Sequence, residues 1–419
     1  MKHFIRYGTN AEKKHIKQFL NHFDGIVFNA NMVSMYAGSI SSFLYVNKKE
    51  YFIDPLTHAF AHNLGFLRNN NGDIKKSLAK LAEHYGIEHI ILEKNRPLKS
   101  SDFNNEFLTM FFENVISFQE NIIHENLEEE WRELVEFVGF ENKPDYIIAP
   151  YFYMDKLNYK QWKKINIEFI KLAKDNYYTQ IVLSKELLED EDFIDEIVSE
   201  VNQTKGVFYW IDNFDETKAT ESELRNVLRF INKIQVSKIN LYGGYFSTLL
   251  KFKGLNGVIH GLEYGESRDV VPVGGGIPVA KYYLPSIKRR LKAEDIIEII
   301  FAKNIMNKEL FHKHICACDK CQEITGGNIQ ELIDSFLKIY ATTKTFQHGK
   351  TLREYPITES KVNSLYHYLN VKYIEFNNVE RHSLDDLLNE LDKAYDNYEP
   401  IFADNFLDYL KIWQKVLNE

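Results

Sequence analysis

The chain has 419 residues, which is too many for one small core and fits one large α/β domain with an appendage, or two domains. Hydrophobic residues make up 44% and charged residues 26%, without any apolar run of the roughly 20 residues that a membrane helix needs. The formal charge of −9 excludes a general attraction to nucleic acid, so such a partner needs a local basic patch. The polar start does not fit a secretory signal, and we expect a cytoplasmic protein with no membrane partner.

Short apolar runs alternate with amphipathic helical stretches over residues 1–270. Continuous apolar strands that alternate with helices indicate a parallel sheet buried on both faces. This pattern predicts a (β/α)8 barrel (TIM barrel), with an open doubly wound sheet as the alternative, because periodicity does not reveal closure. The predicted strands are Ile26–Asn29, Tyr51–Asp54, His89–Glu93, Asp145–Ala149, Gln180–Ser184, Val207–Asp212, Lys238–Tyr242 and Gly257–Gly261.

Three segments complete the predicted organisation. Residues 101–142 are too long for one crossover and predict a helical insertion in the barrel. Residues 271–350 are predicted to form a linker and a metal-binding subdomain. Residues 351–419 are predicted to be a C-terminal helical region, in which Ser383 followed by two aspartates indicates a helix start.

All three cysteines of the chain lie within one short segment with the spacing C-x-C-x2-C, and a histidine follows after 26 intervening residues. Three thiolates and one imidazole make a closed tetrahedral shell that suits one structural Zn²⁺ per chain. An iron–sulfur cluster would need a fourth thiolate. His312 and His314 are alternatives for the fourth ligand. The predicted ligands are Cys316, Cys318, Cys321 and His348.

This cysteine and histidine pattern, C-terminal to a barrel, resembles the zinc subdomain of the tRNA-guanine transglycosylase family. Members of that family are (β/α)8 barrels that exchange guanine for a 7-deazaguanine base in nucleic acid through a glycosyl-enzyme intermediate. The resemblance covers about residues 20–350 at the level of pattern. It implies the zinc ligands named above, a 7-deazaguanine-type base as ligand, and tRNA or DNA as substrate. A homodimer is also expected.

Two aspartates are the predicted catalytic residues. Asp54 ends a predicted strand, as an early aspartate of the family does, and can transfer a proton or bind a base edge; alternatively it is a turn residue before Pro55. Asp269 precedes two valines and a proline and is the best match to the family nucleophile, which attacks the ribose anomeric carbon. Glu263 and Glu266 are alternatives for the nucleophile, and a displaced nucleophile stays open.

Further predicted ligand contacts lie near strand ends, where barrel enzymes place their sites. Tyr151 could stack on a flat base, although an aromatic core is the commoner use of such a residue. Gln180 resembles a family glutamine that reads the base, and Asp212 could supply a polar contact. Gly243 and Gly244 could let a ligand approach the backbone closely.

Two functions are therefore predicted. The first is base exchange on tRNA or DNA, with Arg289 and Arg290 as phosphate contacts unless they form an ordinary solvated surface run. The second is a catalytically altered paralogue in bacterial anti-phage defence that binds a deazaguanine or a protein encoded in the same operon. The residues around Asp54 and Asp269 depart from the family pattern, which supports the second function, but base exchange remains the first prediction.

Overall fold

The computed structural model describes residues 1–138, 143–262, 268–271, 280–348 and 351–419. The chain divides into two compact units, of which the first contains residues 1–216 and 222–272, and the second residues 217–221 and 273–419. The expected metal-binding subdomain and the expected C-terminal helical region thus belong to one unit. Among the described residues, no helix is long and apolar enough to cross a membrane.

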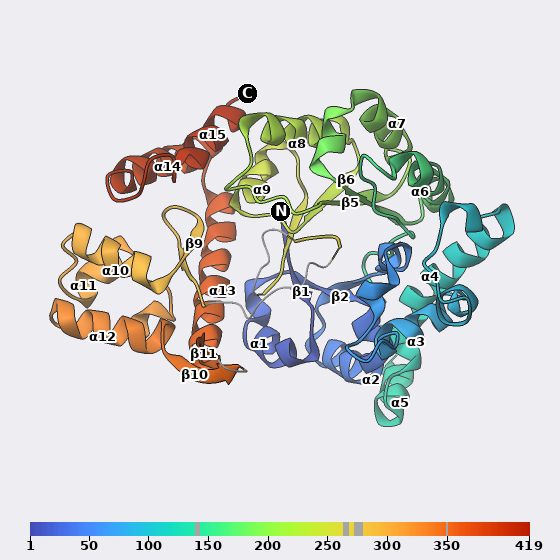
Figure 1. Ribbon diagram of the computed structural model, residues 1–419, viewed down its shortest axis with the longest axis horizontal. Helices are drawn as coiled ribbons and strands as arrows, with labels where there is room; N and C mark the ends of the chain where they lie inside the picture. Colours follow the sequence, from blue (N-terminus) through green and yellow to red (C-terminus); the bar gives the residue numbers. More distant parts are fainter. Residues whose placement is uncertain (139–142, 263–267, 272–279, 349–350) are drawn as a thin grey trace. The chain divides into compact units, whose positions relative to one another are not determined.

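The first unit is built on a seven-stranded parallel sheet (Figure 1). Its strand order is β3-β2-β1-β7-β6-β5-β4, so the first and the last strand pair with each other and the order otherwise follows the chain. This is the order of a barrel that is opened between β3 and β4, and it differs from a doubly wound sheet. The strands are β1 (Lys2–Tyr7), β2 (Gly25–Asn29), β3 (Glu50–Asp54), β4 (Tyr178–Leu183), β5 (Gly206–Ile211), β6 (Ser237–Leu241) and β7 (Gly257–His260).

A short segment lies between the two edge strands of this sheet. Tyr146 forms a parallel bridge with Phe52 of β3, and Ile148 forms one with Tyr178 of β4. This segment was predicted as a full strand, and in the structure it contacts each edge through a single bridge.

One face of the sheet carries the hydrophobic core. Successive side chains of a strand point to opposite faces, so the core residues define which other positions share their face. Arg6 follows Phe4 by two positions, and Asp54 follows Phe52 in the same way. The side chains of Arg6 and Asp54 therefore lie on the face that carries the core. The buried core residues contributed by the strands and the bridging segment are Phe4, Val27, Phe52, Ile148, Val182, Phe208, Trp210, Ile239, Leu241 and Ile259.

Helices surround the sheet of the first unit (Figure 1), and the predicted insertion is present as two helices, α4 and α5. One predicted strand is wrong, and one observed strand was not predicted. Residues His89–Glu93 form one π-helical turn, because a run of three apolar residues suits a helix as well as a strand. Strand β1 was not predicted. The helices are α1 (Lys13–Gln18), α2 (Ala30–Asn47), α3 (Lys76–His84), α4 (Asn105–Glu125), α5 (Glu129–Val138), α6 (Tyr159–Ala173), α7 (Glu191–Val201), α8 (Glu221–Lys233) and α9 (Tyr245–Leu249).

The second unit combines helices with two antiparallel strand pairs. The N–H of Asp386 donates to Ser383 Oγ at 3.2 Å, which confirms the predicted start of α14. The strands are β8 (Tyr282–Leu284), β9 (Arg289–Leu291), β10 (Thr343–His348) and β11 (Thr351–Pro356). The helices are α10 (Ala293–Ala302), α11 (Lys308–His314), α12 (Ile329–Tyr340), α13 (Thr358–Arg381), α14 (Leu384–Tyr398) and α15 (Asp408–Leu417).

Candidate metal centre and strand-end site

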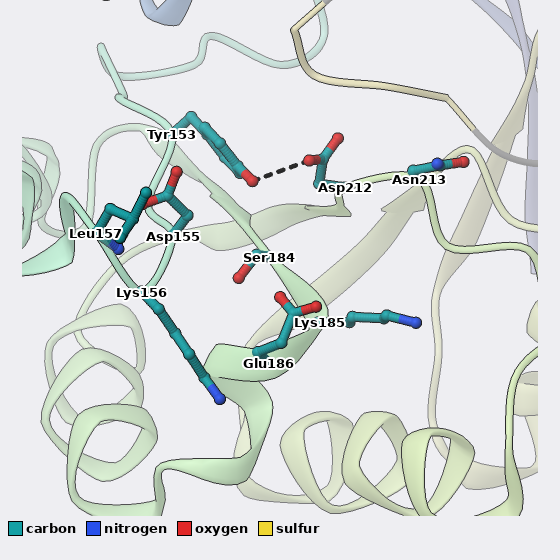
Figure 2. A pocket seen from close by; sticks show the side chains of 9 residues that line it. All are labelled: Tyr153, Asp155, Lys156, Leu157, Ser184, Lys185, Glu186, Asp212 and Asn213. Carbon is teal, nitrogen blue, oxygen red and sulfur yellow. Dashed lines mark hydrogen bonds between the residues drawn. The ribbon is translucent and has the colours of Figure 1, made fainter.

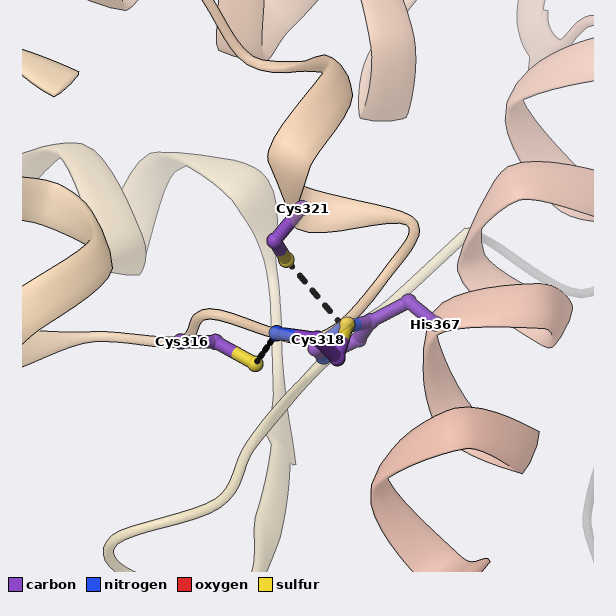
Figure 3. A group of neighbouring side chains, drawn as sticks. All are labelled: Cys316, Cys318, Cys321 and His367. Atoms are coloured by element: carbon purple, nitrogen blue, oxygen red, sulfur yellow. Dashed lines mark hydrogen bonds between the residues drawn. The ribbon is translucent and has the colours of Figure 1, made fainter.

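Three cysteines and one histidine converge in the second unit (Figure 3). Cys316 and Cys318 follow α11, Cys321 begins a short 3-10 turn, and His367 comes from α13. All four side chains are buried, and their ligand atoms lie within 4.8 Å of one another. Zinc–sulfur bonds of about 2.3 Å in a tetrahedron separate the sulfurs by about 3.8 Å. The cluster therefore has the donor set and nearly the size of a metal-binding shell.

The imidazole of His367 is oriented for ligation through one nitrogen. Its Nε2 lies 2.6 Å from the carbonyl oxygen of Tyr283, which can only accept, so Nε2 carries the proton. Its Nδ1 lies 3.3 Å from the sulfurs of both Cys318 and Cys321. The ring also stacks on Tyr282, with the centroids 4.0 Å apart. These contacts fix the tautomer and the ring direction in the way that supporting contacts do in metal sites.

The sulfur of Cys321 has the densest surroundings. The hydroxyl groups of Tyr282 and Tyr340 lie 3.2 Å and 3.5 Å from it. Burial, followed by hydrogen bonds and charges from the other two cysteines, raises the pKa of Cys321 well above its ordinary value. A third negative charge is unfavourable in this cluster on its own, and a bound cation is what would allow all three thiols to ionise together.

The structure brings a different histidine to the cysteines from the one that the sequence predicted. Among the described side chains, His367 lies with the three cysteines. His348 ends β10, and its side chain falls outside the described part of the chain. Of the two alternatives, His312 points its Nε2 to the carbonyl oxygen of Cys321 at 2.9 Å, and His314 is exposed. Sequence spacing gave no signal for His367, because tertiary packing of α13 against β8 brings it to the cysteines.

In the first unit, Asp54 ends β3 and is completely buried. Its Oδ1 accepts hydrogen bonds from the Tyr151 hydroxyl at 2.6 Å and from the Leu56 N–H at 3.1 Å. Its Oδ2 has no hydrogen-bond partner among the described residues, and the nearest cation, the Arg6 guanidinium, is 3.7 Å away. Burial, followed by the charge of Asp54, raises the pKa of Tyr151, which therefore stays a hydrogen-bond donor.

Arg6 was not among the predicted site residues. It is 3% exposed, and its Nε and Nη1 atoms have no hydrogen-bond partner in the described part of the chain. Its guanidinium carbon lies 4.9 Å from the centre of the Tyr242 ring. Burial, and then the charge of Arg268, lowers the pKa of Arg6 to about 9. The sequence could have pointed to Arg6 through the strand KHFIRY, in which alternate side chains share a face and Arg6 lies on the same face as Phe4.

Asp212 follows β5 directly. Its Oδ2 accepts a hydrogen bond from the Tyr153 hydroxyl at 2.8 Å, and its Oδ1 accepts one from the Val270 N–H at 2.6 Å. Burial is the main cause that raises the pKa of Asp212 above its ordinary value. Tyr151 and Tyr153, two positions apart in the chain, thus each hold one of the strand-end aspartates.

A pocket of about 410 Å³ opens beside Asp212 (Figure 2). Its lining comes from the segment around Tyr153 and from the residues that follow β4 and β5, including Ser184, Glu186 and Asn213. In Figure 2 the carboxylate of Asp212 and the hydroxyl of Tyr153 meet at one side of this pocket. The pocket therefore lies at the carboxyl ends of parallel strands, where loops carry functional groups.

The backbone around Asp269 is anchored on both sides. The carbonyl oxygen of Arg268 accepts hydrogen bonds from the Asn213 N–H at 2.9 Å and from the Trp210 indole at 3.2 Å. The N–H of the residue after Asp269 donates to Asp212. The side chain of Asp269 is half-buried. These bonds hold the backbone of Asp269 next to the end of β5.

The other predicted base contacts have different surroundings. Gln180 lies inside β4, is 3% exposed, and neither polar atom of its amide has a hydrogen-bond partner among the described residues. At Gly243 a Cβ atom would lie 2.5 Å from the Cβ of Ser247. The N–H of Gly244 donates to Glu216 Oε1 at 2.9 Å. The two glycines thus allow close packing at the start of α9.

The predicted phosphate contacts are engaged within the second unit. Arg289 donates to the carbonyl oxygen of Phe406 at 3.0 Å and lies over its ring. The Arg290 guanidinium lies 3.8 Å from the centre of the Tyr368 ring. Neither side chain forms part of a solvated basic run.

Comparisons with known proteins find no matching family model, no matching curated protein and no matching solved structure. The resemblance to the transglycosylase family therefore stays a prediction from the sequence. Of the predicted pocket residues, Asp54, Tyr151 and Asp212 lie at or just beyond the carboxyl ends of the parallel segments, whereas Gln180 lies lower in its strand. The alternative nucleophiles fall outside the described residues; they are Glu263 and Glu266.

Proposed function

We propose that the chain is a base-exchanging glycosyltransferase of the tRNA-guanine transglycosylase type, which acts at the carboxyl ends of the strands. The observation that carries this proposal is the anchored backbone of Asp269. Hydrogen bonds on both sides of this half-buried residue hold its backbone next to Asp212 and Asn213, which line the pocket. Effective displacement at a sugar carbon requires a carboxylate that is held in place within reach of a bound ligand.

In the proposed reaction, a carboxylate oxygen of Asp269 attacks the anomeric carbon of the ribose. A glycosyl ester forms, and the bond between the anomeric carbon and guanine breaks, with guanine taking the bonding electron pair and then a proton. The incoming 7-deazaguanine base loses a proton, attacks the same carbon and displaces Asp269, which leaves as a carboxylate. Asp54 Oδ2, which lacks a hydrogen-bond partner among the described residues, would accept from a base edge.

The proposal includes a closed (β/α)8 barrel and a structural zinc ion. The bridges from Tyr146 and Ile148 to the two edge strands support residues 145–149 as the eighth strand. The shell of three cysteines and His367 supports zinc, because it offers four soft or borderline ligands and no open position for water. Zinc would stabilise the second unit, and we assign it no step of the reaction.

The direct test is incubation of the full chain with guanine-containing tRNA or DNA and a labelled 7-deazaguanine base. We expect incorporation of label by the wild-type protein and by Asp175→Asn, an exposed control in the same unit. Asp269→Asn keeps the shape but removes the nucleophilic charge, so we expect incorporation to fall by at least about a thousandfold. Equal incorporation by Asp269→Asn and wild type would refute the assignment of the nucleophile.

A second function is the binding of a deazaguanine or a protein partner from an anti-phage operon without transfer. The observation that favours it is the surroundings of Asp54, whose Oδ1 already accepts two hydrogen bonds and whose Oδ2 faces Arg6. A carboxylate held in this way is better suited to binding than to moving protons. Binding of a deazaguanine without incorporation of label into any nucleic acid would select this function.

A further inference from the structure

The strand-end site contains a buried cation whose hydrogen-bonding capacity is not filled. Arg6 is 3% exposed, and two of its three nitrogen atoms have no acceptor among the described residues. The distance of 3.7 Å between its Nη2 and Asp54 Oδ2 is too long for a hydrogen bond. A buried guanidinium is unfavourable unless its donors are paired, so this arrangement calls for an additional acceptor.

A second guanidinium shares the same aromatic surface. The guanidinium carbons of Arg6 and Arg268 lie 4.9 Å and 5.6 Å from the centre of the Tyr242 ring, and Arg268 Nη1 donates to the Tyr242 hydroxyl at 3.2 Å. Tyr242 has a left-handed backbone with φ of 65°, which is a strained conformation for a residue with a side chain. Such strain is concentrated at ligand sites. Here it positions the ring that both arginines contact.

The other titratable groups near these arginines do not supply the missing acceptor. The carboxylate of Glu12 accepts hydrogen bonds from the N–H groups of Gly8 and Thr9 at 2.6 Å and 3.2 Å. Burial lowers the pKa of His58 well below its ordinary value, so this imidazole is neutral. Asp269 follows Arg268 in the chain and is half-buried. Two nitrogen atoms of Arg6 therefore stay without an acceptor among the described residues, and this guanidinium has donors left for an anion.

We propose that Arg6 and Arg268 form a binding site for the oxyanion of a small-molecule ligand, a carboxylate or a phosphate group, against the ring of Tyr242. The planar guanidinium presents parallel N–H donors that match the two oxygens of either group. The site goes beyond the proposed base exchange, because oxyanion binding requires neither a nucleophile nor a nucleic acid. It applies equally to a protein that binds without transfer.

The test uses the zinc-loaded full chain and measures thermal stability and binding heat in sodium phosphate, sodium acetate and sodium chloride at equal ionic strength. We expect phosphate or acetate to raise the Tm of wild type more than chloride does, and the more effective anion identifies the group. Loss of one charge-assisted hydrogen bond should weaken anion binding by about tenfold or more in Arg6→Gln and in Arg268→Gln. Arg132→Gln, an exposed control in the first unit, should bind as wild type does.

The proposal is overturned if neither anion stabilises wild type more than chloride does, or if both arginine variants keep wild-type affinity. Should Arg6→Gln fail to fold, as judged by circular dichroism, the affinity of Arg268→Gln decides alone. Asp269→Asn should keep its anion affinity even if it loses base exchange. Failure of the oxyanion site and failure of the transferase proposal are therefore separate outcomes.

Discussion

The two units carry two kinds of polar cluster. In the second unit, three sulfurs and one imidazole surround a common centre, and neighbouring tyrosines complete the hydrogen bonds of that shell. In the first unit, Arg6 and Asp54 face each other without a hydrogen bond, and both keep unused donors or acceptors within the described residues. The first cluster could hold one metal ion. The second keeps buried polar atoms without hydrogen-bond partners among the described residues, which a ligand with its own polar edge could bind.

The largest expected effect concerns the completeness of the metal shell. His367→Ala removes one of four ligands, so zinc content should fall from one equivalent per chain to well below one. The second unit should unfold while the first stays folded, because apparent zinc affinities of about 10–16 kcal/mol are folding free energy in small zinc domains. Metal analysis and circular dichroism measure both results. His348→Ala is the matched control and should keep its zinc; the reverse pattern would restore His348 as the ligand.

A smaller effect concerns the rigidity of the strand-end region. In Gly243→Ala the new Cβ would lie 2.5 Å from the Cβ of Ser247, so the start of α9 must shift. We expect a loss of about 1–3 kcal/mol in the free energy of unfolding of the first unit, the usual cost of overpacking. Denaturant titration measures it. Gly65→Ala, where the nearest atom is 3.5 Å away, is the control. If both substitutions are neutral, the strand-end region is looser than the structure indicates.

The last effect is a dependence of the free energy of unfolding of the first unit on pH. Burial lowers the pKa of His62 from 6.5 to about 4 and that of His58 well below 6.5. As pH falls below 6.5, the unfolded chain binds protons that the folded chain does not, so the free energy of unfolding decreases. This loss should continue down to about pH 4.

Replacing both histidines by glutamine should reduce the slope of stability between pH 6.5 and about 4. Loss of zinc in acid affects wild type and variant alike, so the difference between them reports on the first unit. His382→Gln, at an exposed position, should leave the slope unchanged. An unchanged slope in the double variant would show that these histidines titrate normally.

The features that the sequence predicted correctly are those that depend on residues close together in the chain. The close spacing of the three cysteines, the apolar strands and the cap at Ser383 need only neighbouring residues to be recognised, and the structure agrees with them. The sequence could not predict that His367 joins the cysteines, because α13 brings this residue to them from far along the chain. The role of Arg6 was missed because a short strand with charged residues does not stand out until the core residues around it are known.

If Asp269 is the nucleophile of a base exchange at the strand ends, it must form a covalent intermediate with the nucleic acid. The most direct measurement incubates the protein with guanine-containing tRNA or DNA, denatures it and maps covalently attached nucleotide by mass spectrometry. We expect an adduct on Asp269 in wild type and in Asp175→Asn, and none in Asp269→Asn. Incorporation of a labelled base with the adduct on another residue, or undiminished incorporation by Asp269→Asn, would contradict it.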